Sequence, residues 1–148
     1  MAGLRAVAQT AEIDTTTSKR TLLQLIAAAN HRVLVKEISI SFDGTSNTAA
    51  PILVQVATQS TSGTVTGLTP QKMNPDDTET LQTTAGHTAT VEPAETAEIM
   101  GENVHPQGGY TWQAPFGGEI VVPGGGRLGV AVTAGAAVNA KARMIFEE

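Results

Sequence analysis

Alternation of apolar and polar residues is the feature that most restricts the fold of this chain. Ile38, Ile40 and Phe42 are separated by Ser39 and Ser41, and a period of two places the apolar side chains on one face of a half-buried strand. The same alternation, or a short apolar run, recurs along much of the sequence. We therefore predict strands over 21–26, 32–42, 51–58, 98–104, 110–116, 119–122, 127–133 and 138–146.

One residue interrupts the clearest of these strands. Lys36 breaks the apolar face of segment 32–42, so we expect a β-bulge or a sheet edge at this position. Asp43-Gly44 follows, and this pair is favoured in tight turns. Residues 43–50 are expected to join strands 32–42 and 51–58 as a hairpin with a long polar loop.

Two segments depart from the alternating pattern. Residues 1–18 contain a polar, aperiodic stretch and are expected to form an extended N-terminal arm in front of a single domain, 19–148. Residues 60–97 are rich in Thr, Gly and Pro, with one or two short strands expected near 64–73 and 89–92. Because a structureless insert of this length is uncommon in a compact domain, we expect a long excursion that packs on a neighbouring subunit or another partner.

Short strands separated by turn residues indicate the fold class. They predict an all-β domain, a β-sandwich of jelly-roll type with about eight strands. The 148 residues suit one domain. Aromatic residues make up only 3% of the chain, so the core must consist of Val, Ile, Leu and Ala, which fill a thin layer between two sheets.

Charge and cysteine content exclude several classes of protein. Nine basic residues stand against fourteen acidic ones, for a net charge of −5, which argues against nucleic-acid binding because that requires clustered Lys and Arg. The absence of Cys excludes disulfides, thiolate metal sites and Cys nucleophiles. No apolar run is long enough for a membrane helix or a signal-peptide core. We expect a soluble protein, made in the cytoplasm, that does not contact membranes.

A glycine-rich motif resembles a nucleotide-binding fingerprint. Gly124, Gly126 and Gly129 match G-x-G-x-x-G, but that fingerprint requires a helix next, whose N-terminus holds the pyrophosphate. Residues 128–132 alternate instead and predict a strand. We interpret the motif as a Gly-rich hairpin loop, where glycine adopts positive φ without steric cost.

Other catalytic and metal-binding patterns are also missing. His31, His87 and His105 lack the spacing of metal ligands, and Asp76-Asp77 lacks the alternating ligands of a calcium loop. The G-x-S-x-G turn of serine hydrolases does not occur. A small jelly-roll enzyme of the cupin type would need clustered His and carboxylate ligands. We expect no enzymatic activity, no cofactor and no metal.

An aromatic segment and the N-terminal arm supply the candidate binding residues. Tyr110, Trp112 and Phe116 lie close together, and the first two share a face if the segment is a strand. They suit the hydrophobic core, a protein interface, where aromatic residues are enriched, or a glycan-binding platform. The candidate interface residues are Leu4, Arg5, Tyr110, Trp112 and Phe116.

Several segments resemble small virion proteins of tailed bacteriophages. They are Thr21-Leu22-Leu23-Gln24-Leu25, Arg32 to Phe42 with Asp43-Gly44-Thr45-Ser46, His105-Pro106-Gln107-Gly108-Gly109-Tyr110, and the final Phe146-Glu147-Glu148. The resemblance implies a capsid decoration (cement) protein with a β-sandwich fold and no catalytic residues. Such a protein lies on the outside of the head and clamps neighbouring major capsid subunits. It would be a homo-oligomer, with a trimer favoured over a dimer because a capsid lattice offers threefold sites. The alternative is a glycan- or receptor-binding module of a fibre or adhesin, with Tyr110 and Trp112 exposed on a concave face.

Overall fold

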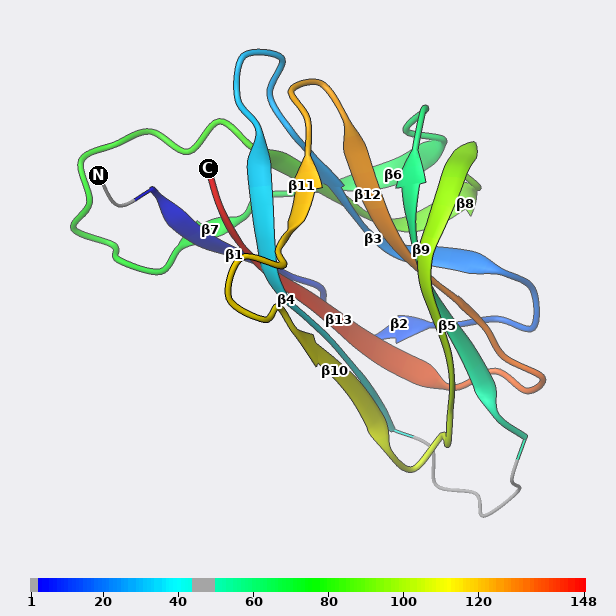
Figure 1. The fold of residues 1–148 in the computed structure, drawn as a ribbon. Coiled ribbons are helices and arrows are strands. Elements are labelled where there is room, and N and C mark those ends of the chain that lie inside the picture. Colours follow the sequence, from blue (N-terminus) through cyan, green and yellow to red (C-terminus); the bar gives the residue numbers. More distant parts are fainter. Residues whose placement is uncertain (1–2, 44–49) are drawn as a thin grey trace.

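The computed structural model describes residues 3–43 and 50–148, which form two antiparallel sheets and no helix. Sheet A contains β1 (Arg5–Gln9), β2 (Ile13–Asp14), β4 (Val33–Phe42), β7 (Gln71–Lys72), β10 (Gly109–Gln113), β11 (Ile120–Val122) and β13 (Asn139–Glu147). Sheet B contains β3 (Arg20–Ile26), β5 (Ile52–Gln59), β6 (Thr64–Leu68), β8 (Thr84–Val91), β9 (Glu95–Val104) and β12 (Arg127–Thr133). The two sheets pack as a sandwich (Figure 1), so the predicted β-sandwich is confirmed.

The chain passes repeatedly from one sheet to the other. Eight strands form two halves with the orders β1-β13-β4-β10 and β3-β12-β5-β9. The remaining five strands extend these halves, so the predicted count of about eight falls short of the thirteen in the described residues. The alternation between sheets is compatible with two Greek keys. The jelly-roll type itself stays a prediction.

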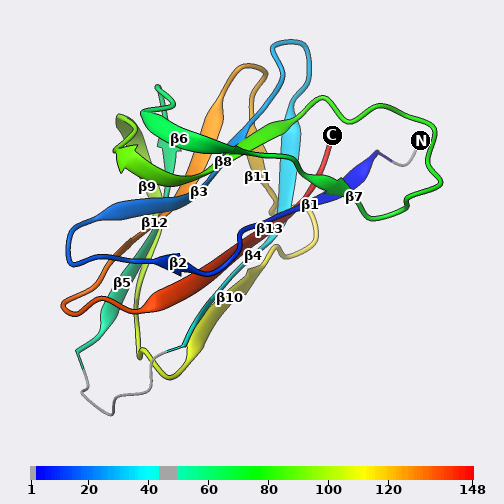
Figure 2. The same ribbon diagram turned by 180° about the vertical axis from the view of Figure 1, so that it is seen from behind.

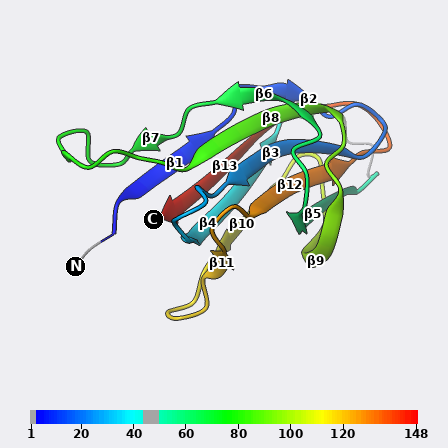
Figure 3. The ribbon, with the colours of Figure 1, turned by 90° about the horizontal axis from the view of Figure 1, so that it is seen from above.

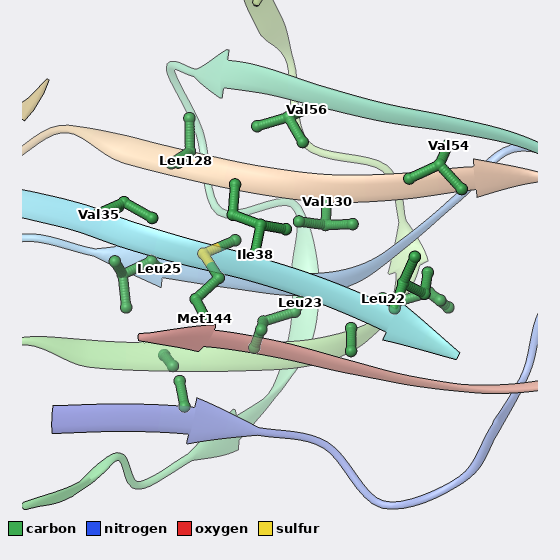
Figure 4. Close-up of a cluster of buried hydrophobic side chains, with 14 of the residues drawn as sticks. Leu22, Leu23, Leu25, Val35, Ile38, Val54, Val56, Leu128, Val130 and Met144 are labelled. Atoms are coloured by element: carbon green, nitrogen blue, oxygen red, sulfur yellow. The ribbon is translucent and has the colours of Figure 1, made fainter. Parts of the chain in front are cut away.

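The core lies between the sheets and is built from aliphatic side chains. Ile38 and Ile40 of β4 lie opposite Met144 and Ala142 of β13, and all four are almost completely buried. Figure 4 shows how Ile38 and Met144 gather with aliphatic residues of sheet B. Each fully buried Val, Leu, Ile or Met side chain contributes about 1.5–3 kcal/mol. The expectation of a thin core of Val, Ile, Leu and Ala is confirmed, with Met144 and Phe146 added.

Lys36 forms the β-bulge that its position in the sequence predicts. Ile145 lies opposite Glu37 and Phe146 lies opposite Val35, which leaves Lys36 without a partner in β13. The alternative of a sheet edge is wrong, because β4 pairs with β13 on one side and with β10 and β11 on the other. The extra residue lets Val35 and Ile38 both face the core although they are three positions apart.

The predicted hairpin between strands 32–42 and 51–58 is wrong. β4 belongs to sheet A and β5 to sheet B, where β5 pairs with β12 and β9. Both strands alternate as predicted, but alternation records which face is buried and not which strand is the neighbour. Gly44 of the predicted turn lies outside the described residues.

The predicted N-terminal arm is also wrong for residues 3–18. β1 pairs with β13 over its whole length and with β7 on its other edge. Ala6 and Ala8 are fully buried, and the hydroxyl of Thr10 accepts a hydrogen bond from the Ala142 N–H at 3.0 Å. The domain therefore begins well before residue 19. Alanine at the inward positions gives only a weak apolar signal, which explains the error.

The Thr-rich middle segment is more ordered than expected. β6 and β8 extend sheet B, and β7 joins the edge of sheet A. Residues 73–83 do extend beyond the sandwich, on the side where β1 begins and β13 ends (Figures 1 and 2). The carboxylate of Glu148 holds the end of this segment, because it accepts hydrogen bonds from the N–H groups of Gln82 and Thr83 at 2.8 and 2.9 Å. Packing of the segment on a partner stays a prediction.

A buried polar cluster lies on the face of sheet B that points away from the core. Gln24 is fully buried, and its Nε2 donates to Gln59 Oε1 at 2.6 Å and to the Thr61 carbonyl at 3.0 Å. Gly129 lies beside this cluster. A Cβ atom at Gly129 would lie 2.3–2.6 Å from atoms of the Gln59 side chain, so any larger residue must displace it.

We predict that Gly129→Ala lowers the free energy of unfolding by about 1–3 kcal/mol, because Gln59 must move and give up its bond to Gln24. Chemical denaturation followed by circular dichroism measures the change. Gly67→Ala is the matched control: a Cβ there meets no atom within 4 Å, and the backbone φ lies outside the left-handed region. The control should stay within about 0.5 kcal/mol of the wild type. Equal losses in both variants would contradict the prediction.

A candidate docking surface on the outer face of sheet A

The bulge at Lys36 coincides with a loop that leaves the edge of sheet A. β10 pairs with Glu37–Ser41 and β11 with Val33–Val35, so the two strands follow one another along the same edge of β4. Residues 114–119, which we name the Phe116 loop, protrude between these strands (Figure 3). The Ala114 N–H donates to the Lys36 carbonyl at 2.8 Å, and Lys36 Nζ lies 2.9 Å from Glu119 Oε1. Lys36 therefore holds both ends of the loop.

A tight turn presents Phe116 at the tip of this loop. The Gly118 N–H donates to the Pro115 carbonyl at 2.8 Å, and Gly117 has a φ of 77°. A positive φ at the third position identifies a type II turn, which favours glycine there. Phe116 occupies the second position and is completely exposed, with a relative accessibility of 108%. The hydrogen-bonded turn thus keeps the aromatic side chain of Phe116 exposed to water.

Ion pairs connect the Phe116 loop to the rest of the outer face. Glu147 lies 3.5 Å from the Arg5 guanidinium and 3.9 Å from Lys36 Nζ, and Lys36 pairs with Glu119. The Arg5, Lys36 and Glu147 side chains point away from the core, because they follow or precede buried residues of β1, β4 and β13. Each exposed pair contributes only about 0–1 kcal/mol to stability. The main effect of these ion pairs is therefore to fix the Phe116 loop relative to the sheet.

The five candidate interface residues differ in their exposure and do not form one surface. Arg5 and Phe116 lie on this outer surface, and the Arg5 side chain is 68% exposed. Leu4 is 3% exposed, and its backbone N–H and carbonyl both bond to Glu148. Leu4 is therefore buried within the chain itself and is not part of the exposed surface.

Tyr110 and Trp112 point toward the core. They lie opposite Ile40 and Ile38 of β4, are half-buried and pack against the hydrophobic core. Burial, together with the nearby Glu102 carboxylate, raises the pKa of the Tyr110 hydroxyl. Of the three alternatives for this pair, packing against the core is the one that the structure shows, and a contact with a partner stays a prediction. The exposed concave platform required by the glycan-binding alternative is not formed by these two residues.

The glycine motif and two of the histidines lie in turns and strands whose local contacts the structure shows. The turn at Pro123–Gly126 leads from β11 in sheet A to β12 in sheet B, so the predicted hairpin is wrong although the turn is present. His87 Nδ1 lies 2.8 Å from Thr88 Oγ1, and His105 Nδ1 accepts from the Gln107 N–H at 3.1 Å. Within residues 3–43 and 50–148, no three His, Asp or Glu side chains gather as metal ligands would. This part of the chain also holds no helix long and apolar enough to cross a membrane.

Comparison of the chain with protein-family models, with curated proteins and with solved structures finds no match.

Two elements of the surface were missed at the sequence level. Val121 is 50% exposed on β11, and only its place in a short edge strand shows this. The second role of Lys36, as the anchor of the Phe116 loop, depends on Glu119, which is far from it in sequence. The predicted bulge was the signal that could have pointed to it.

We predict that Lys36→Met raises the pKa of Glu119 back toward its ordinary value. In the wild type, the hydrogen bond from Lys36 and a backbone hydrogen bond lower the pKa of this carboxyl group. A lowered pKa in the folded state means that the stabilising contribution is present above the unfolded-state pKa and is lost as the pH falls. NMR titration of the Glu119 side-chain carboxyl measures the shift. Lys19→Met, which removes the Lys19–Glu95 pair in another part of the molecule, should leave the pKa of Glu119 unchanged.

Proposed function

We propose that this chain is a structural virion protein that binds the outer surface of a phage head and stabilises the capsid lattice by clamping neighbouring major capsid subunits. Its resemblance to small tailed-phage virion proteins suggests this role. The β-sandwich fold suits it, since a rigid sheet can present loops to a flat lattice. In this proposal the protein works as a homo-oligomer on the capsid exterior, with a trimer favoured over a dimer.

The exposed Phe116 on its braced turn is the observation that carries a binding role. An apolar aromatic side chain in water is unfavourable, and burial of a Phe contributes about 1.5–3 kcal/mol. Because the Pro115–Gly118 turn is hydrogen-bonded and Lys36 holds the loop residues on either side of it, Ala114 and Glu119, little conformational freedom is lost when a partner covers it. Such preorganisation raises affinity. Phe116 is suited to act as an anchor in an apolar pocket of the capsid protein.

The projecting segment 73–83 supplies a second place for contact. It contains Met73, which is 53% exposed, and it is attached at both ends by backbone groups that bond to Arg5 and Glu148. Several weak contacts from one oligomer bind together with an effective concentration that exceeds the affinity of any single contact. An oligomer with several such segments can therefore hold a lattice without one large interface.

We predict that Phe116→Ala weakens binding to heads of the encoding phage by at least about tenfold, since about 1.4 kcal/mol corresponds to a factor of ten. Co-sedimentation of the purified protein with heads measures the affinity. Val91→Ala is the matched control, because Val91 is 60% exposed on β8 in the other sheet. Equal binding of both variants would exclude Phe116 as the anchor. Failure of the wild type to co-sediment, with light scattering showing a monomer at micromolar concentration, would overturn the proposed function.

A further inference from the structure

The outer face of sheet A contains a shallow hollow of about 210 Å³. It is lined by Gln9 of β1, Ser39 and Ser41 of β4, and Lys141, Ala142 and Arg143 of β13. The strand register explains how these residues meet. Arg143 lies between Ser39 on one neighbouring strand and Gln9 on the other, and Lys141 lies opposite Ser41.

Small side chains form the floor of the hollow. Ser39 and Ser41 occupy outward positions where longer side chains would fill the space, and the next strand continues the floor with Thr111 and Gly109. The hydroxyl groups of Ser39 and Thr111 lie 3.3 Å apart. The floor is therefore polar, low and fixed by the sheet, while the longer Lys141, Arg143 and Gln9 side chains stand along one side.

The two charged side chains that line the hollow, Lys141 and Arg143, are hydrogen-bond donors, and Gln9, Ser39 and Ser41 can both donate and accept. Arg143 Nη2 bonds to Glu37 at 2.7 Å, which leaves other donors of the guanidinium, and its Nε is buried without a partner. Lys141 is exposed and takes part in no ion pair among the described residues. No carboxylate is among the lining residues.

Besides Glu37, which is bonded to Arg143, two acidic groups lie just beyond the hollow. Glu12 and Asp43 line a smaller adjoining hollow that shares Ser41 and Lys141 with the first. The carboxylate of Asp43 already accepts two hydrogen bonds from Asn139, at 2.9 and 3.0 Å. Lys141 therefore stands between an acidic neighbour and an open hollow lined by polar side chains. An incoming anion would meet the ammonium group on the side of the hollow.

We propose that this hollow binds an acidic side chain, an Asp or Glu carboxylate, on the surface of the partner protein. A volume of about 210 Å³ is below the range of about 300–1,000 Å³ typical of small-molecule sites, but it accommodates the end of one side chain. Arg143, Lys141 and the serine hydroxyls offer charge-assisted and neutral hydrogen bonds to a carboxylate. A nucleic acid is disfavoured because the chain carries a net charge of −5.

The inference rests on the proposed function, because the hollow lies on the outer face of sheet A and the Phe116 loop leaves the edge of the same sheet. In this arrangement Phe116 would be buried in an apolar pocket of the capsid protein, and an acidic residue beside that pocket would enter the hollow. The apolar contact would supply most of the affinity. The charged contact would fix the orientation and raise the association rate, as interfacial charges commonly do.

The first experiment tests the hollow without capsids. Titration with a hexaglutamate peptide, followed by NMR, should shift the backbone amide signals of Ser39, Ser41 and Lys141. Lys141→Glu should abolish these shifts, whereas Arg32→Glu, the same charge change at an exposed residue before β4, should preserve them. Inorganic phosphate serves as a second probe. Shifts with phosphate but none with hexaglutamate would overturn the proposal of a carboxylate, as would equal effects of the two variants.

The second experiment separates this inference from the proposed function. Lys141→Glu should bind heads about tenfold more weakly than Arg32→Glu, with a weaker dependence on salt. If heads bind and the two variants are equal, the inference fails and the proposed function stands. If hexaglutamate binds in the hollow but heads do not bind at all, the proposed function fails and the carboxylate site stands. If Lys141→Glu instead dissociates the oligomer in light scattering, the hollow serves a second copy of this chain and the inference is overturned.

Discussion

The β-bulge at Lys36 is the local constraint on which the candidate surface depends. β4 is central in sheet A and must keep apolar residues on its inner face at both ends. The inserted residue allows this, and it also places a backbone carbonyl and an ammonium group where no ladder partner occupies them. These two groups are the ones that hold Ala114 and Glu119. Core packing and presentation of Phe116 therefore depend on the same irregularity.

Much of the fold could be predicted because alternation reports burial directly. Ile38, Ile40, Val130 and Val132 all lie at the inward positions that their spacing indicates. Strand pairing was harder to predict from the sequence, because the same alternation fits a strand that pairs with its neighbour in a hairpin and a strand that crosses to the other sheet. The N-terminal strand was missed because its inward residues are Ala6 and Ala8, whose small side chains produce little contrast with the polar positions. The two-residue strands β2 and β7 are too short for any periodicity.

The sequence could indicate which segment contains the candidate site, but not how the side chains of that segment are arranged in space. Tyr110, Trp112 and Phe116 look equivalent in the sequence, yet they have different surroundings. Strand parity turns Tyr110 and Trp112 toward the core, whereas Phe116 follows the end of β10 and lies on a turn. The hollow beside Lys141 was not foreseen at all. It arises from small serines in one strand next to long cationic side chains in another, and that combination depends on strand register.

Two of the sheet edges, at β9 and at β10 with β11, are poorly suited to the addition of a strand, so the proposed docking would use side chains. β9 is long enough to accept one, but Glu95, Glu98 and Glu102 lie along it, and register shifts interrupt its pairing at Thr96 and Ile99. Charges and bulges at an edge oppose pairing with another chain. On sheet A the corresponding edge is divided by the Phe116 loop, which leaves only the five residues of β10 in one continuous run. The loop that interrupts this edge is thus the one that exposes Phe116, the anchor in the proposed function.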